Sequence, residues 1–228
     1  MITRAQLVKV IDHTLLAPSA TVDDIERLCR EAIDYGFYAV CVNTCYIKHA
    51  VSMLKGSSVK VVSTVGFPLG AVSSDVKAYE AAWAVEAGAS EVDMVLNVGL
   101  LKSGDFFEVR EDIEGVVKAA KKANTKAKIK VIVETSLLEI NEKVSVCRLV
   151  KDAGADLIKT STGFGPGGAV VEDIQLFKKM VGDSIGIKAA GGIKDLNTLM
   201  SMLEAGATRI GTSSTVSIMN QLEQNNND

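Results

Sequence analysis

Residues 86–96 have the sequence Glu-Ala-Gly-Ala-Ser-Glu-Val-Asp-Met-Val-Leu, in which a helix C-terminus leads through a short turn into a buried strand. The glycine is typical of the left-handed residue that ends a helix, and the apolar run after it is typical of a buried strand. The same junction recurs at 152–159 and 204–211, and a looser version stands at 35–42. Helix followed by strand, many times over, predicts parallel strands joined by crossover helices.

Eight short apolar segments fit the strands of such an arrangement. They are Val10–His13, Ala39–Asn43, Lys60–Val65, Glu91–Leu96, Lys128–Glu134, Asp156–Lys159, Ile185–Lys188 and Arg209–Gly211. Apolar residues at helical spacing lie between them, for example in 103–122, where Ser103 is placed to cap the helix. The pattern predicts a single (β/α)₈ TIM barrel with parallel strands over residues 1–220.

An open, doubly wound sheet is the alternative fold. We favour the barrel, because no Gly-x-Gly-x-x-Gly follows the first strand and the repeats run evenly along the chain. We find no linker and no second domain. Residues 221–228 are polar and rich in asparagine, so we expect them to be a frayed tail.

Composition excludes several classes of protein. Apolar residues make up 47% of the chain, the net charge is −3 and the calculated pI is 5.5, so we expect a compact protein that binds neither nucleic acid nor membrane. The N-terminus lacks a signal peptide's apolar stretch, which favours the cytoplasm. Four cysteines without Cys-x-x-Cys spacing and two distant histidines, His13 and His49, indicate no metal site, and we expect no cofactor.

Two lysines each close an apolar strand and are followed at once by a glycine-rich loop. Lys159 precedes Thr-Ser-Thr-Gly-Phe-Gly-Pro, and Lys188 precedes Ala-Ala-Gly-Gly. Lysine is almost never fully buried without a partner, and a desolvated lysine beside a second cation becomes a usable nucleophile. Lys60, Lys128 and Lys130 stand at the starts of their strands, where the ammonium group is expected simply to reach solvent.

Active sites of such barrels lie at the carboxyl ends of the strands. The polar residues predicted there are Asp12, Cys41, Asn43, Asp93, Glu134, Lys159 and Lys188. Asp is rare in strands, so Asp93 is expected to pair with a lysine, and Glu134 is expected to do the same. Cys41 fits a small core residue better than a nucleophile, and His13 fits a structural hydrogen bond.

The loops after the seventh and eighth strands contain Gly191, Gly192 and the run Gly211–Ser214. In this fold these loops often bind phosphate, since glycines let the backbone approach an anion and a helix N-terminus favours negative charge. Ser213 and Ser214 would open the last helix. Ordinary turn and capping chemistry is the other interpretation of these residues.

Five segments together resemble the deoxyribose-phosphate aldolase family of class I, Schiff-base-forming aldolases. They are Ile11–Leu16 (IDHTLL), Val40–Asn43 (VCVN), Glu91–Gly99 (EVDMVLNVG), Lys159–Phe164 (KTSTGF) and Ile187–Ile193 (IKAAGGI). The resemblance covers nearly the whole chain in order, and its two lysine segments are highly specific.

The resemblance implies a role for each matched residue. Lys159 would form the Schiff base, Lys188 would lower the proton affinity of Lys159 and help move protons, Asp93 would be proton donor and acceptor, and Asp12 would support the lysines. The substrate and its phosphate would be held by Cys41, Thr162, Gly163, Gly191, Gly192, Ser213 and Ser214. Phe164 stands where some members of the family carry a lysine, so phosphate binding would rest more on backbone N–H groups.

The reaction so implied is reversible cleavage of 2-deoxy-D-ribose 5-phosphate to D-glyceraldehyde 3-phosphate and acetaldehyde, in deoxyribonucleotide catabolism. A protonated imine supplies the electron sink that carbon–carbon cleavage needs without a metal. The partners would be small phosphorylated sugars and aldehydes, and we expect a homo-oligomer, either a dimer or a tetramer. The alternatives are another phosphosugar barrel enzyme, such as an isomerase, and a non-catalytic phosphosugar-binding protein.

Overall fold

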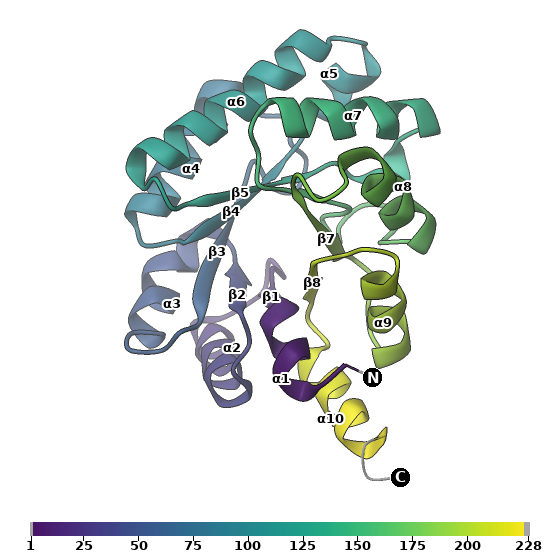
Figure 1. Ribbon diagram of the computed structural model, residues 1–228. Coiled ribbons are helices and arrows are strands. Elements are labelled where there is room, and N and C mark those ends of the chain that lie inside the picture. Colours follow the sequence, from purple (N-terminus) through teal and green to yellow (C-terminus); the bar gives the residue numbers. More distant parts are fainter. Residues whose placement is uncertain (1, 226–228) are drawn as a thin grey trace.

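The computed structural model describes residues 2–225, which form a closed barrel of eight parallel strands with helices around it (Figure 1). The strands are β1 (Ile11–Leu15), β2 (Ala39–Val42), β3 (Lys60–Val65), β4 (Glu91–Val95), β5 (Lys128–Ile132), β6 (Leu157–Lys159), β7 (Gly186–Ala190) and β8 (Arg209–Thr212). They pair in chain order, and β8 closes the barrel by pairing with β1. The predicted TIM barrel is confirmed.

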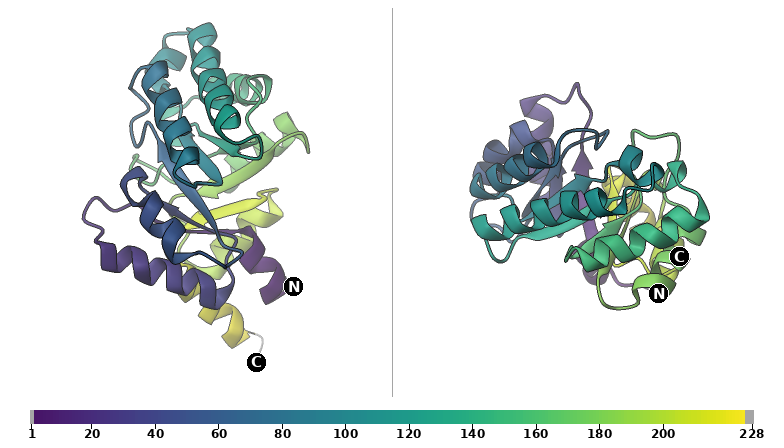
Figure 2. Two further views of the ribbon diagram at one scale, coloured as in Figure 1. Left: turned by 90° about the vertical axis from the view of Figure 1, so that its left-hand side faces the viewer. Right: turned by 90° about the horizontal axis from the view of Figure 1, so that it is seen from above.

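Helical segments separate each strand from the next. The α-helices are α1 (Arg4–Leu7), α2 (Val22–Tyr35), α3 (Ile47–Met53), α4 (Ser74–Glu86), α5 (Val98–Lys102), α6 (Phe106–Ala123), α7 (Ile140–Asp152), α8 (Val171–Val181), α9 (Leu196–Glu204) and α10 (Thr215–Asn225). Three short 3₁₀ segments are η1 (Val8–Val10), η2 (Thr44–Tyr46) and η3 (Thr135–Leu137). The two ends of the described chain lie side by side (Figure 2), and Arg4 Nε is 3.5 Å from Glu223 Oε1.

The junctions between helix and strand are built as the sequence predicts. Gly88, Gly154 and Gly206 all have positive φ, at 110°, 78° and 117°, where an L side chain would be strained. The helix predicted over 103–122 starts later than expected. Asp105 caps α6 through the backbone N–H of Glu108, whereas Ser103 lies at the end of α5.

Alternate residues of the strands face opposite sides of the barrel wall. On β2 and β3, Val40, Val42 and Val61 pack in the large core between strands and helices. Ala39, Cys41 and Val62 instead form a small separate cluster with Leu16. TIM-barrel interiors are usually filled by layers of branched apolar residues. Here many interior positions carry charged side chains instead, among them Asp12, Glu91, Asp93, Lys130, Lys159 and Lys188.

The tail predicted at 221–228 overlaps the last helix, because α10 continues through Asn225. Gln221 accepts a hydrogen bond from the backbone N–H of Leu196, 2.8 Å away, which ties α10 to α9. Residues 226–228 of the predicted tail lie outside the described residues. Between residues 2 and 225, no helix combines the length and the apolar character needed to cross a membrane.

Candidate active site

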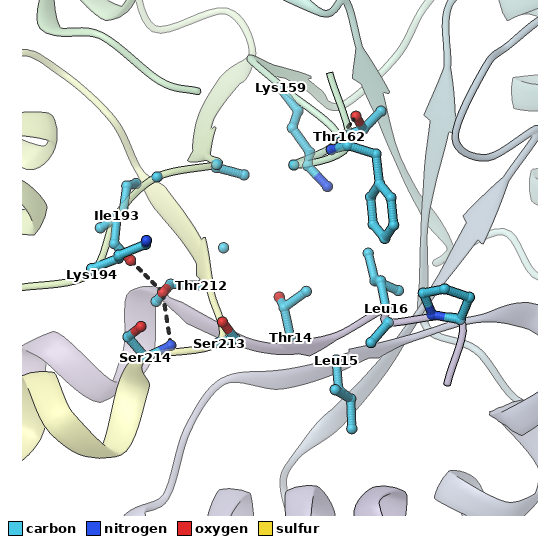
Figure 3. A pocket seen from close by; sticks show the side chains of 18 residues that line it. Thr14, Leu15, Leu16, Lys159, Thr162, Ile193, Lys194, Thr212, Ser213 and Ser214 are labelled. Carbon is cyan, nitrogen blue, oxygen red and sulfur yellow. Dashed lines mark hydrogen bonds between the residues drawn. The ribbon is translucent and has the colours of Figure 1, made fainter. Parts of the chain in front are cut away.

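A cavity of about 380 Å³ opens at the carboxyl ends of the strands, among the segments after β1, β6, β7 and β8 (Figure 3). Lys159 projects into it from β6, and Ser213 and Ser214 face it from the loop after β8. The cavity thus contains the predicted nucleophile and the predicted phosphate loops. Of the three buried lysines described next, Lys159 is the one that lines it.

Lys159 and Lys188 stand side by side on paired strands and share one carboxylate. The two residues are register partners between β6 and β7. Asp93 Oδ2, from β4, accepts hydrogen bonds from both ammonium groups at 2.8 Å. Lys188 also donates to Asp12 from β1. All four side chains are at most 2% exposed, so the structure brings together the four residues predicted to carry the chemistry.

Lys130 belongs to the same cluster, contrary to the prediction that its ammonium group reaches solvent. Its side chain is fully buried in the barrel, and Nζ lies 2.7 Å from both Asp93 Oδ1 and Glu91 Oε2. The strand alternation explains the error. Lys128 and Lys130 share a face of β5, but Lys128 lies at the exposed end and Lys130 one layer deeper.

Arg209 and Glu91 continue the cluster toward the amino ends of the strands, and sequence analysis missed both. Arg209 donates to Asp12 Oδ1 at 2.9 Å and to Glu91 Oε2 at 3.2 Å. Its guanidinium carbon lies 3.5 Å from the centre of the Tyr38 ring, and Tyr38 donates to Glu91 Oε1 at 2.6 Å. Glu91 and Asp93 are two residues apart on β4, so their side chains point to the same face of the strand. That spacing was the feature of the sequence that could have placed Glu91 in the cluster with Asp93.

The electrostatic surroundings give the three lysines different pKa values. Burial lowers the pKa of Lys159; Asp93 opposes that effect and the nearby Lys188 adds to it, so the pKa of Lys159 lies below its usual value. Burial acts on Lys188 and Lys130 too, but the carboxylates around them raise the pKa of each above its usual value. Burial would raise the pKa of Asp93, but the three lysines hold it well below its ordinary range.

Gly211 makes room for this arrangement from β8. A Cβ atom at Gly211 would lie 2.9 Å from Cε of Lys188 and 3.2 Å from Cβ of Ala190. The residue was predicted both to end the strand and to begin a phosphate loop, and the strand continues one residue further, through Thr212. β7 likewise continues through Ala190, so Lys188 is inside its strand rather than at the end.

The opposite side of the cavity is built from the loops after β7 and β8. Thr212 Oγ1 donates to the carbonyl of Ile193 at 2.6 Å and accepts from the N–H of Ser214 at 3.0 Å, which joins the two loops (Figure 3). Ser214 precedes α10, and its carbonyl accepts from Ile218 in the first turn. Lys194, which sequence analysis did not single out, also lines the cavity here.

The glycines predicted to hold phosphate surround the same space. Gly163, Gly191 and Gly192 all line the cavity. Phe164 lines it as well; its side chain is 50% exposed and meets Phe67 edge to face, with ring centres 5.3 Å apart. An apolar ring therefore lines this part of the cavity.

Glu134 does not pair with a lysine in the described structure, so that expectation is wrong. It lies just beyond β5 with φ of 53°, and Oε2 accepts from the backbone N–H and the hydroxyl of Thr162. The loop after β6 passes so close that a Cβ at Gly165 would lie 2.7 Å from the Glu134 carboxyl group. Glu134 therefore anchors the loop that carries Thr162 to the cavity.

Two further residues do not line the cavity, although Cys41 was predicted to help hold the substrate. Cys41 is fully buried beside Ala39 and Val62, and burial raises the pKa of its thiol to about 11, so it is not a thiolate near neutral pH. His13 makes structural contacts, as predicted. Its Nε2 lies 2.8 Å from Glu31, and its Nδ1 lies 2.7 Å from the hydroxyl of Thr215 at the start of α10.

Comparisons with known proteins agree over nearly the whole chain. Residues 6–219 match the profile of the DeoC/LacD family aldolases. The deoxyribose-phosphate aldolase of Carboxydothermus hydrogenoformans is 54% identical over 222 residues, covering 97% of each chain, and that of Thermococcus gammatolerans is 55% identical over 215 residues, covering 93% of this chain and 95% of the relative. The tetrameric deoxyribose phosphate aldolase of Aeropyrum pernix has a similar structure, with a TM-score of 0.90, 34% identity and coverage of 97% of this chain and 92% of that one.

Proposed function

The chain belongs to the DeoC/LacD family of aldolases, which makes it a lyase, and we propose that it cleaves 2-deoxy-D-ribose 5-phosphate reversibly to D-glyceraldehyde 3-phosphate and acetaldehyde through an imine on Lys159. The observation that carries the proposal is the position of Lys159. It is buried, it lines the cavity, and its pKa is lowered from the usual value. A neutral amine is what attack on a carbonyl requires.

The reaction begins when the Lys159 amine adds to the aldehyde carbon C1 and water is lost, leaving a protonated imine. Asp93 Oδ2, 2.8 Å from Nζ, then faces a fixed positive charge and stabilises it. The C2–C3 bond breaks as the C3 hydroxyl gives up its proton, the bonding electrons move into an enamine on C1 and C2, and C3 leaves as the aldehyde carbon of D-glyceraldehyde 3-phosphate. Protonation at C2 and hydrolysis of the new imine release acetaldehyde and restore the amine.

Asp93 and Lys188 are the groups placed to move those protons. Asp93 is already hydrogen-bonded to Lys159 and Lys188, so a proton can pass between the two nitrogens through one carboxylate. Asp12 supports this pair, because it accepts from Lys188 and from Arg209 on opposite sides. We therefore assign Asp12 a positioning role.

The phosphate would lie on the side of the cavity formed by Gly163, Gly191, Gly192, Ser213 and Ser214. Ser213 and Ser214 come directly before α10, whose N-terminus would favour the negative charge of a phosphate, and Thr212 holds the two loops together. Lys194 would add a positive charge to this side, where Phe164 offers none. Thr162, held by Glu134, would position the loop after β6 against the substrate.

We further propose that the enzyme acts in the cytoplasm, in deoxyribonucleotide catabolism, as a homo-oligomer. The tetrameric relative from Aeropyrum pernix supports the last point. Large apolar side chains are exposed on the described surface, including Leu69, Tyr79 and Phe107, and contact between subunits would cover such residues.

Covalent capture at Lys159 tests the mechanism. An imine is reduced by borohydride to a stable amine, whereas a docked sugar is not, so borohydride added with substrate should inactivate the enzyme irreversibly. Peptide mapping should place the added mass on Lys159. Lys159→Ala should abolish both labelling and turnover, while Lys188→Ala should slow labelling without moving it.

Other outcomes would point elsewhere. Label on Lys188 would exchange the roles of the two lysines. Turnover without any label would contradict the imine and favour acid–base chemistry of the isomerase type. Binding without turnover or label would favour a phosphosugar-binding protein.

A further inference from the structure

The charged cluster in the barrel extends well beyond the residues that can touch substrate. From Lys159 it passes to Asp93, then to Lys130 and Glu91, with each step a contact of 2.7 or 2.8 Å. At the amino-terminal side of the barrel, Glu91 accepts hydrogen bonds from Tyr38 and Arg209. A second branch returns from Arg209 through Asp12 to Lys188. Glu91 and Arg209 thus close a ring of contacts below the reacting lysine.

The cluster has a specific charge balance. Among the described residues it contains three carboxylates, Asp12, Glu91 and Asp93, and four basic side chains, Lys130, Lys159, Lys188 and Arg209. None of these side chains is more than 8% exposed, so water compensates little of an excess charge. With Lys159 neutral, three positive charges face three negative ones. Protonation of Lys159 adds a fourth positive charge to a desolvated interior.

The other ionisable groups near the ring do not alter this balance. Cys41 lies close to Lys159 and Lys188, and burial raises the pKa of its thiol to about 11, so it is uncharged. Tyr38 donates its hydroxyl hydrogen to Glu91. Lys60 donates to the Tyr38 hydroxyl at 2.7 Å, but it is only half-buried, at the rim of the barrel.

We propose that Glu91 and Arg209 are positioning residues that tune the protonation of Lys159 in opposite directions from the side opposite the substrate, because Arg209 adds a positive charge that favours the neutral amine and Glu91 adds a negative charge that favours the ammonium group. The inference rests on the proposed role of Lys159 as the imine-forming amine. It differs from a purely structural role for Glu91 and Arg209 in one respect. A structural role predicts loss of stability, whereas charge balance predicts shifts of opposite sign at a residue that neither side chain touches.

Paired charge-removing variants test the proposal. Glu91→Gln removes a negative charge, so Lys159 should titrate at lower pH; Arg209→Gln removes a positive charge, so Lys159 should titrate at higher pH. A unit charge about 10 Å away shifts an amine by about one pH unit at an effective dielectric constant of about 20. The double variant leaves two carboxylates, Asp12 and Asp93, facing two cations, Lys130 and Lys188, so Lys159 should titrate close to its value in the unmodified protein.

The titration is best followed by NMR of the lysine Cε carbons in protein labelled with ¹³C-lysine, with the Lys159 signal assigned by its absence from Lys159→Arg. Tyr38→Phe removes a hydrogen bond to Glu91 without changing charge, and Arg209→Lys keeps the charge without the ring contact. Both controls should leave the titration of Lys159 within about 0.3 pH unit, well inside the one-unit effect of a lost charge. If one charge-removing variant does not fold, the other still tests the proposal, because the direction of its shift in the titration of Lys159 is predicted.

Two results would overturn the inference. One is that both single variants move the titration in the same direction or leave it unmoved. The other is a double variant displaced as far as either single. The NMR readout does not require an imine, so failure of borohydride capture in the unmodified protein would count against the proposed function alone, while an unmoved titration with successful capture would count against the charge balance alone.

Discussion

Three lysines in one barrel differ in how many carboxylates each one meets. Lys130 contacts Glu91 and Asp93, Lys188 contacts Asp12 and Asp93, and Lys159 contacts Asp93 alone. All three pay the same kind of desolvation penalty, but only the first two have a second carboxylate to offset it. The pKa is accordingly raised for Lys130 and Lys188 and lowered for Lys159. The nucleophilic role proposed for Lys159 thus depends on its lack of a second carboxylate neighbour.

Phe164 provides a test of the phosphate side at the level of one residue. It lines the cavity with half of its side chain exposed, so a lysine at this position can place its ammonium group in the cavity without burial. Phe164→Lys should lower KM for deoxyribose 5-phosphate about three- to fivefold, since one exposed charged contact contributes up to about 1 kcal/mol. KM for unphosphorylated deoxyribose should stay unchanged.

Steady-state kinetics with both sugars, at low and high salt, would check this expectation. Phe164→Leu is the matched control, because it removes the ring without adding charge. An equal fall in KM for both sugars would show that the phosphate does not lie near Phe164.

At the level of strands and helices, periodicity predicted the elements but not the depth of each residue within them. The strand Lys60–Val65 was located at its observed bounds, and the glycine junctions were identified with their left-handed geometry. Lys130 was taken for a rim residue, because a strand five residues long shows which face a side chain is on and not how far the neighbouring strands cover it. That coverage depends on the stagger of the closed barrel, which single-strand patterns do not contain.

The same limit explains the other misplaced residues. Arg209 and Glu91 open their strands in the sequence, yet the pairing of β8 with β7 and of β4 with β5 places both inside the wall. Glu134 was assigned to β5 and to a lysine partner, but the strand ends at Ile132 and the chain turns into a left-handed residue. By contrast, the pairing of Asp93 with lysine was predictable, since a buried carboxylate requires a cation.

Gly211 on β8 offers a test at this scale. Alanine here would bring Cβ within 2.9 Å of Cε of Lys188, so the end of the Lys188 side chain must shift relative to Asp12 and Asp93. We expect kcat to fall at least about tenfold, because displacements near 1 Å in a reacting site can cost about a hundredfold. The circular dichroism spectrum should be retained.

Gly115 is the matched control for this substitution. It lies within α6, and a Cβ there would meet nothing within 4 Å. Gly115→Ala should leave kcat unchanged and raise stability by about 0.5–1 kcal/mol through helix propensity. Full activity in Gly211→Ala would mean that Lys188 does not need its observed position.

For the whole molecule, stability and reactivity come from two different layers. The apolar core lies between the strands and the helices, whereas the barrel interior holds a compensated set of charges. Such a set contributes little net stability when complete and is strongly destabilising when one member loses its charge. The pH range in which the barrel is stable should therefore depend on the pKa values of the buried carboxylates and lysines in its interior.

The sign of that dependence follows from the direction of each shift. The pKa of Asp12 is lowered from 3.8 to about 2, with burial opposed by Lys188, Lys130 and Arg209, and the pKa values of Asp93 and Glu91 are lowered as well. A carboxyl group with a lowered folded-state pKa stabilises the fold above its unfolded value and loses that contribution as the pH falls through the folded value. Asp12 alone accounts for about 2 kcal/mol, lost between about pH 4 and pH 2. On the alkaline side, the raised pKa of Lys130 and Lys188 keeps their contribution until the pH exceeds about 10.5.

We therefore expect these carboxylates and the two lysines with raised pKa to add no pH dependence between about pH 5 and pH 10, and the free energy of unfolding to fall steeply below pH 4. Lys159, whose pKa is lowered, adds a gain in stability as the pH rises toward its unfolded pKa. Urea unfolding at fixed protein concentration, at pH 7, 4, 3 and 2.5, measures it. The acid loss should persist in 1 M salt, because buried pairs are screened far less than exposed ones. Asp12→Asn should be less stable at pH 7 yet show a shallower acid limb, since one of the titrating carboxylates is gone. If its acid limb ran parallel to that of the unmodified protein, Asp12 would not be linked to folding, and the acid sensitivity would have to come from carboxylates outside the barrel.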